Sequence, residues 1–143
     1  MKTYYNKTGY KNPMQDPNNS RKTKPQIEIF NILKQDLYNV EMEVPLNRYS
    51  LDIVLNIKDC KIDIEYDGYN WHKDKQDFDR KRDSDVSRAG FKILRIKSGS
   101  KIPDKEELLK NIETLINEDC IHYKEIILSD WEYRFNKDNN IHK

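Results

Sequence analysis

The twelve residues KIDIEYDGYNWH, from position 61 to position 72, constrain the fold more than any other part of the sequence. Isoleucines and carboxylates alternate in them, and successive side chains of a β-strand point to opposite faces. The alternation predicts a strand with one apolar face and an opposite face that carries Asp63, Glu65 and Asp67. Three negative charges on one strand face destabilise it unless a positive charge neutralises them, and a divalent metal ion is the usual neutraliser.

A second apolar run, LDIVLNI at 51–57, precedes this strand and is separated from it by a short turn at 58–60. The pair predicts an antiparallel hairpin, which would bring Asp52 into the neighbourhood of Glu65 and Asp67. A carboxylate between Leu and Ile is costly to bury without a partner, so Asp52 is interpreted as functional. The alternative for Glu65 and Asp67 is the solvated face of an edge strand.

The remaining periodicity predicts an α/β protein with a mixed sheet flanked by helices. Helices are expected at about 26–38, at 74–89 and at 103–118. The second of these is expected to be largely exposed and to stop at Gly90. Two extended segments with a possible turn at 47–48 are expected at 40–57, and FKILRIKS at 91–98 is expected to be a strand parallel to a neighbour through a β-α-β crossover. For 121–134 both helix and strand stay open.

Composition places the chain among globular single domains, since 143 residues are enough for one core and 36% of them are hydrophobic. Cys60 and Cys120 lie far apart, without metal-ligand spacing. Neither a signal peptide nor an apolar run near 18 residues is found, so a cytoplasmic protein without membrane contact is expected.

The net charge of +1 hides a basic N-terminal segment. Residues 1–25 hold six cations and one acid, with Gly, Pro and Asn that favour loop structure. Basic extended arms are found in nucleic-acid binders, whereas the alternative is a solvated tail. The residues expected to contact nucleic acid are Lys7, Lys11, Arg21, Lys22 and Lys24 in this arm, with Lys73 and Arg95 beyond it.

Three ordered blocks resemble one nuclease family. They are the acid of LDIVLN, the strand KIDIEYDG followed by Trp71 and His72, and DRKRDSDVSRAGFKILRI with an Arg-Asp pair seven residues before Gly90. The blocks resemble the Vsr-like (very-short-patch-repair-like) branch of the PD-(D/E)XK nuclease superfamily over roughly 26–117. In the arm, TGYKNPMQDP resembles short DNA-contacting modules of phage and homing endonucleases. The resemblance divides the chain into an arm (1–25), a nuclease core (26–117) and a C-terminal extension (118–143).

The resemblance implies a restriction-endonuclease-like three-layer core and an intracellular DNA endonuclease from a bacterium or phage. Its cofactor would be Mg²⁺, with Mn²⁺ as a substitute, and its substrate double-stranded DNA. Asp52 and Glu65 would be the principal ligands, since Mg²⁺ prefers oxygen ligands, and Asp67 a further one. His72 would assist proton transfer, and Glu28 would be the helix glutamate that completes many such sites.

The sequence departs from the superfamily pattern at Asp67, which stands where a lysine is usual. This leaves a catalytically silent DNA-binding protein as the alternative, and a homodimer or a subunit of a larger nuclease complex stays open. For His72 a structural role beside Trp71 also stays open. Arg82 and Asp83 are interpreted as an exposed helical ion pair, whereas Arg95 would either contact phosphates or offset the acids.

Overall fold

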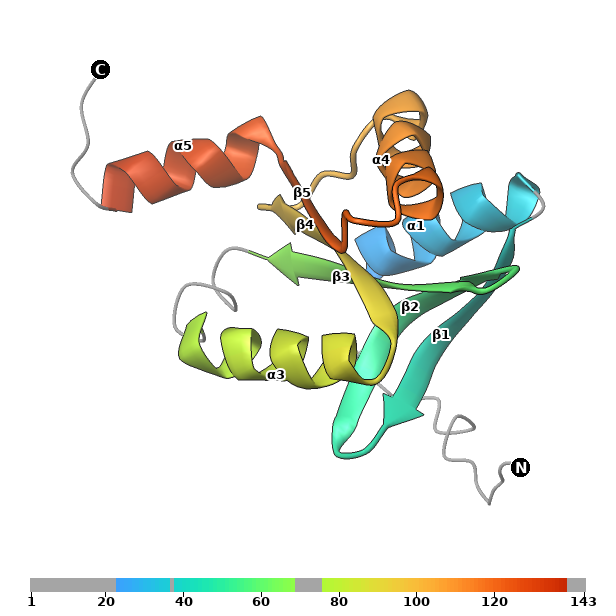
Figure 1. Ribbon diagram of the computed structural model, residues 1–143. Coiled ribbons are helices and arrows are strands. Elements are labelled where there is room, and N and C mark those ends of the chain that lie inside the picture. The colour runs from blue at the N-terminus through green and yellow to red at the C-terminus, as the bar shows by residue number, and fades with distance from the viewer. Residues whose placement is uncertain (1–22, 37, 69–75, 139–143) are drawn as a thin grey trace, which may run out of the picture.

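The computed structural model describes residues 23–36, 38–68 and 76–138, and Figure 1 shows their arrangement around a five-stranded sheet. Its strands lie in chain order across the sheet: β1 (Asn39–Leu46), β2 (Tyr49–Ile57), β3 (Cys60–Gly68), β4 (Phe91–Ser98) and β5 (Tyr123–Ile127). The pairs β1–β2 and β2–β3 are antiparallel, and β4 runs parallel to both β3 and β5. The mixed sheet confirms the predicted fold class and the predicted β2–β3 hairpin.

Helices cover both faces of this sheet, which gives the expected three layers (Figure 1). The helices are α1 (Lys24–Gln35), α3 (Gln76–Arg88), α4 (Lys105–Asn117) and α5 (Ser129–Asp138). Apolar residues of α1 and α4 pack with Ile62 and Ile64 on one face, and Val86 of α3 packs with Ile93 on the other. None of the described helices is long and apolar enough to span a bilayer.

Helix α1 begins at Lys24, two residues before the predicted start, because Thr23 caps it. The Thr23 hydroxyl accepts a hydrogen bond from the N–H of Gln26 at 3.3 Å, and Pro25 lies in the first turn, where its missing N–H costs nothing. Ile29 and Leu33 point into the core at helical spacing. This start also turns Gln26 toward the sheet.

Helix α3 connects β3 to β4 and makes the predicted crossover, so the two strands are parallel. It ends at the expected place, since Gly90 adopts φ 101°, a conformation that residues with a Cβ rarely adopt. The helix is less exposed than predicted, because Asp79, Arg82 and Val86 are buried against the sheet. A charged helix therefore contributes charged groups to the interior.

The C-terminal part of the chain contains both of the structures that the sequence left open. Residues 123–127 form β5, which pairs in parallel with β4, and α5 begins two residues later. The range 118–143, expected to be an extension, therefore contributes the last strand of the sheet. The carboxyl ends of β3, β4 and β5 lie at the same edge, because these strands are parallel.

Candidate active site

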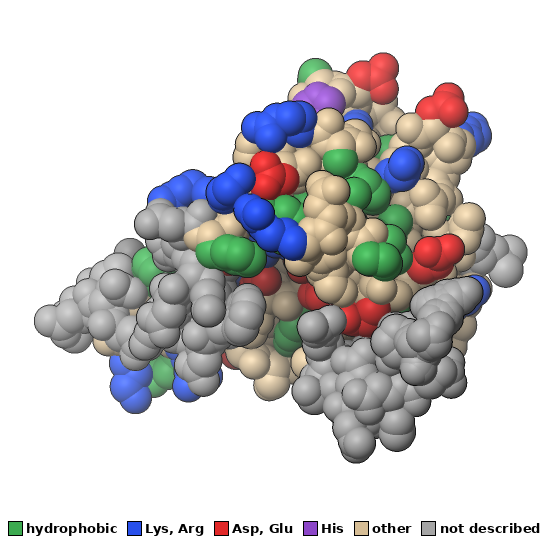
Figure 2. Space-filling view, turned by 90° about the horizontal axis from the view of Figure 1, so that it is seen from below, with side chains coloured by type: hydrophobic (Ala, Val, Ile, Leu, Met, Phe, Trp, Pro, Cys, Tyr) green, Lys and Arg blue, Asp and Glu red, His purple; other side chains and the backbone are tan. Residues whose placement is uncertain are grey.

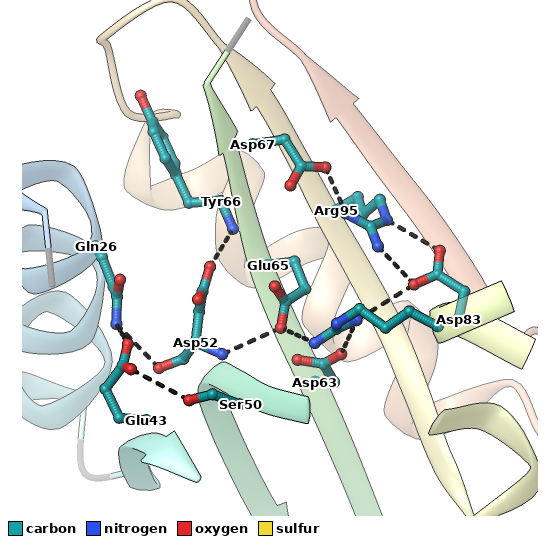
Figure 3. A network of polar contacts seen from close by, with 11 residues as sticks. Gln26, Glu43, Ser50, Asp52, Asp63, Glu65, Tyr66, Asp67, Asp83 and Arg95 are labelled. Carbon is teal, nitrogen blue, oxygen red and sulfur yellow. Dashed lines mark hydrogen bonds and ion pairs between the residues drawn. The ribbon is translucent and has the colours of Figure 1, made fainter. Parts of the chain in front are cut away.

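The acids of β3 lie on the face of the sheet that α3 covers (Figure 3). Ile62 and Ile64 point into the opposite core, as the alternation predicts. Asp63 is 0% exposed, Glu65 7% and Asp67 3%. The predicted sharing of one face is confirmed, but this face is buried, so the alternative of a solvated edge does not hold.

Asp52 lies directly beside Glu65, on the neighbouring strand (Figure 3). The N–H of Asp52 donates to Glu65 Oε2 at 3.1 Å, and the N–H of Tyr66 donates to Asp52 Oδ2 at 3.1 Å. Side-chain oxygens thus accept hydrogen bonds from the main chain where the two strands meet. The hairpin brings these two acids together as predicted, each with a second oxygen that these contacts do not use.

The strands β1 and β2 both reverse their faces at this point. Met42 and Ile53 pair across the strands and pack in the core under α1 and α4, whereas the next paired residues, Val44 and Leu51, pack toward α3. Residues two apart on a regular strand share a face, so the alternation breaks between these pairs. The residues at the break are Glu43 and Asp52.

Glu43 is held at this break by two donors. Its Oε2 accepts from Gln26 Nε2 at 3.0 Å, and its Oε1 accepts from the hydroxyl of Ser50 at 3.2 Å. Gln26 Nε2 also donates to the main-chain oxygen of Asp52 at 3.1 Å. Glu43 adopts φ 53°, a left-handed conformation that is uncommon for a residue other than glycine inside a strand. Three elements therefore converge on Asp52.

Arg82 corrects one interpretation of the sequence. It was expected to form an exposed helical pair with Asp83, but it is only 6% exposed. Its guanidinium binds Glu65 Oε2 through Nη2 and lies 3.1 Å from Asp63 Oδ2 through Nη1. The contact with Asp83 exists as well, at 3.3 Å. Arg82 thus links α3 to the acids of β3, because a buried charge needs a partner of opposite sign.

Arg95 performs a similar role on β4. It is 2% exposed, donates to Asp67 Oδ2 at 2.5 Å, and forms two bonds to Asp83, of 2.6 and 2.9 Å. This geometry favours the interpretation that Arg95 offsets the acids over a direct contact with phosphate. It also turns Asp67 toward β4, whereas Asp52 and Glu65 lie side by side where β2 meets β3 (Figure 3).

Within the described part of the chain, this site carries more negative than positive charge. Six carboxylates and two guanidinium groups make up the network: Glu43, Asp52, Asp63, Glu65, Asp67 and Asp83 with Arg82 and Arg95. Burial first, and then the charge of Glu65, raise the pKa of Asp52 to about 9. Burial and the charge of Asp63 raise the pKa of Glu65 well above its ordinary value, against the opposing effect of Arg82. A further cation would relieve these shifts.

Asp52 and Glu65 fit a divalent cation by the chemistry of their donors. Mg²⁺ binds oxygen ligands, keeps several waters and is usually held by one or two carboxylates plus substrate phosphates. Among the described residues no three His, Cys, Asp or Glu side chains form a cage for a metal ion. Two adjacent carboxylates with an unbalanced negative charge are what an Mg²⁺ site of this open kind requires.

Other predicted site residues lie elsewhere. Glu28 is exposed on α1, and Gln26 lies beside Asp52 in its stead. The pKa of Tyr66 is raised mainly by burial, and the charge of Glu28 adds to this effect. Lys24 begins α1 and is exposed. The predictions for His72 and for Lys7, Lys11, Arg21, Lys22 and Lys73 lie outside the described residues.

The sequence contains a signal for the burial of two residues of the network, of which Gln26 was not predicted and Arg82 was predicted to be exposed. Gln26 precedes Ile29 and Leu33 by three and seven residues, so it shares their buried face. Arg82 precedes the buried Val86 by four. Glu43 had no such signal. Regular alternation in 40–44 would place its side chain on the face opposite to that of Met42 and Val44. The reversal of faces involves two strands together, so the pattern of one strand does not predict it.

Basic side chains gather outside the acidic network on the α3 side of the molecule. Seen from below in Figure 2, Lys and Arg side chains form a group next to Asp and Glu side chains. On α3, Lys81 and Arg88 are among the exposed cations, with side chains 62% and 73% exposed. This face therefore presents both signs of charge to a ligand.

Comparison with known proteins adds one match. The model of the family REase_MTES_1575, a restriction-endonuclease-like family, matches residues 26–116, which run from α1 to the last turn of α4. The match covers most of the chain and includes Gln26, Glu43, Asp52, Glu65 and Arg82. No curated protein and no solved structure gives a significant match to the chain.

Proposed function

Because the chain belongs to the restriction-endonuclease-like family REase_MTES_1575, we propose that it is a metal-dependent endonuclease that hydrolyses phosphodiester bonds of double-stranded DNA. In this proposal it is of the Vsr-like type, with Mg²⁺ as its cofactor. The observation that carries the proposal is the pair Asp52 and Glu65. Two carboxylates meet between β2 and β3 in a site with surplus negative charge, which is what a divalent cation needs.

Each side chain has a defined part in this proposal. Asp52 and Glu65 would hold the ion through oxygens that the main-chain contacts leave unused. A bound Mg²⁺ activates water and neutralises the phosphate that is attacked. Arg82 fixes Glu65 from α3 and prevents its carboxylate from rotating away. His72 would serve as the proton carrier, since the unperturbed imidazole pKa is about 6.5.

Cations outside the acidic network support DNA as the substrate. Exposed Lys and Arg side chains stand on the α3 side, and the arm at 1–25 adds six more cations. Neutralisation of phosphates by such side chains supplies affinity for the DNA backbone and does not depend on its sequence. In the proposal these cations bind the duplex, and the acids hold the ion at the scissile bond.

A nicking assay with supercoiled plasmid tests the function. The wild-type chain should nick DNA with Mg²⁺ or Mn²⁺ and stop when EDTA is added. Asp52→Asn should lose cleavage yet bind DNA as well as the wild type or better, because it removes a metal ligand and leaves in place the cations that bind the duplex. The matched control is Asp59→Asn, an exposed acid in the turn after β2, which should cleave normally. Binding without cleavage under every metal condition would instead indicate a silent DNA-binding protein.

A further inference from the structure

Glu43 combines two energetic costs in one residue. A non-glycine residue in the left-handed region is strained, and Glu43 adopts φ 53° in the middle of β1. It also buries a carboxylate, since the residue is only 9% exposed, and a buried charge is costly without partners. Glycine would adopt the same conformation without strain and without a charge. The side chain of Glu43 therefore contributes something that the turn of the strand alone does not need.

Its contacts indicate what that contribution is. Both oxygens of Glu43 already accept hydrogen bonds, one from Gln26 and one from Ser50. The amide of Gln26 has two N–H donors, and its nitrogen also donates to the main-chain oxygen of Asp52. One amide group thus joins the carboxylate of Glu43 to the backbone of Asp52 across β1, β2 and α1 (Figure 3).

Asp52 is consequently held at three points. Its main-chain oxygen accepts from Gln26, its N–H donates to Glu65, and its carboxylate accepts from the N–H of Tyr66. The orientation of Gln26 depends on Glu43, because the amide donates to both acceptors from one nitrogen. Residues that orient a ligand in this way typically change metal affinity 10-fold to 100-fold when they are mutated.

We propose that Glu43 is a positioning residue, which orients Asp52 for metal binding through Gln26 and is not itself a ligand. This inference rests on the proposed function, because it assigns a part in the same site. Ser50 holds the second oxygen of Glu43 and keeps the carboxylate from rotating toward the ion. The strained conformation at Glu43 reverses both strands together, and this reversal places Asp52 out of the regular alternation.

The test measures Mn²⁺ affinity of the full chain without DNA, by electron paramagnetic resonance of the free ion. Glu43→Ala keeps the Cβ and the backbone strain but loses the acceptor, so affinity should fall about 10-fold to 100-fold. The Mn²⁺ affinity of Gln26→Ala should fall by a similar factor. Glu43→Gln keeps an acceptor for Gln26 and a donor for Ser50, so its affinity should stay within about threefold of wild type. The control is Glu41→Ala, an exposed acid on the same strand, which should bind normally.

The variants separate the inference from the function on which it rests. Wild-type binding that Asp52→Asn abolishes supports the metal site alone. If Glu43→Ala and Gln26→Ala then bind Mn²⁺ as wild type does, the positioning role is wrong. It is also wrong if Glu43→Gln loses as much affinity as Glu43→Ala, since the carboxylate would then be a ligand. A wild-type chain that binds no Mn²⁺ overturns both. Thermal unfolding checks each variant, and Gln26→Ala decides the question if Glu43→Ala does not fold.

Discussion

At the scale of single residues, the site depends on one buried acid, Glu65, and one partly buried acid, Asp52, which lie together before any cation is present. Asp52 and Glu65 receive hydrogen bonds from main-chain N–H groups and from Arg82, but these donors do not balance the charge of the surrounding carboxylates. The raised pKa of Asp52, about 9, follows from this burial and from the charge of Glu65. At neutral pH the metal-free protein therefore keeps a proton on Asp52, which a cation would displace.

Asp52→Asn is expected to stabilise the metal-free protein, and to do so more strongly as the pH rises. The folded pKa of about 9 exceeds the unfolded value of about 3.9. Between these values the folded state binds a proton that the unfolded state has lost, so the contribution of Asp52 to stability falls as the pH rises from about 4 to about 9. Asn has no such ionisation. Urea unfolding in EDTA should show a gain of at least about 1 kcal/mol at pH 8.

The same experiment at pH 5 should give a much smaller gain in stability. The pH then lies only about one unit above the pKa of Asp52 in the unfolded chain. Asp119→Asn, an exposed acid in the turn between α4 and β5, is the control and should keep the wild-type pH dependence. A variant at Asp52 with the same pH dependence as wild type would mean that this carboxylate is ionised in the folded protein.

The residues of the site differ in how far the sequence predicts them. Alternation predicted the common face of Asp63, Glu65 and Asp67, since a strand has a fixed period of two. The hairpin predicted the neighbourhood of Asp52. Glu43 could not be predicted, because its position depends on a reversal that β1 and β2 undergo together.

At the scale of elements, α3 is the helix that completes the site. It carries Arg82 to the acids of β3 and Asp83 to Arg95 of β4. The sequence predicted the helix and its end at Gly90, but its high charge suggested exposure. Val86 and Arg82 share a face at helical spacing, so the charged residue is drawn into the interior with the apolar one. Its partners from β3 are distant in sequence, which is why composition alone misleads.

Arg82→Met should therefore be strongly destabilising. It keeps the long apolar stem but leaves Asp63 and Glu65 without their buried partner, and removal of one member of a buried pair costs about 3–5 kcal/mol. The loss should be smaller at pH 5 than at pH 8, because the stranded acids are then more readily protonated. Urea unfolding measures it. Lys81→Met, whose exposed ion pair with Asp85 lies one residue away, should cost less than about 1 kcal/mol.

Equal losses of stability for the two methionine variants would contradict this account of α3.

The other elements show where sequence patterns suffice. The β2–β3 hairpin and the crossover were predicted because long runs of alternating or apolar residues are bounded by turns. At 121–134 the apolar run is too short for its pattern to distinguish a helix from a strand. The pairing of β5 with β4 decides the structure of this segment.

At the scale of the whole molecule, the chain divides its charge unevenly along the sequence, with an excess of cations in its N-terminal segment and an excess of acids after it. The chain has a net charge of +1, yet its first 25 residues hold six Lys or Arg against one Asp. The predicted role of this arm lies outside the described residues. The structure does set where a truncation should stop, because Thr23 caps α1 and has to be retained.

Deletion of residues 1–22 should weaken DNA binding in a salt-dependent way. It removes the five cations Lys2, Lys7, Lys11, Arg21 and Lys22. Each phosphate contact contributes about −0.9 to the slope of log affinity against log salt, so the slope should flatten by at most about 4.5 and, with partial engagement, by about 2 to 3. Fluorescence anisotropy with duplex DNA over a range of salt measures it. Cleavage should survive at low salt and drop near physiological salt, and an unchanged slope would show that the arm does not contact DNA.

A crystal soaked in Mn²⁺, with diffraction recorded at the manganese absorption edge, tests the central claim that Asp52 and Glu65 share a divalent cation. The account predicts an anomalous peak within about 2.0 to 2.3 Å of one oxygen of each carboxylate. Asp52→Asn crystals treated in the same way should lack it. The claim is contradicted if wild-type crystals show no peak between these two side chains, or if the ion binds other residues while Asp52 and Glu65 keep only their contacts with N–H groups and Arg82.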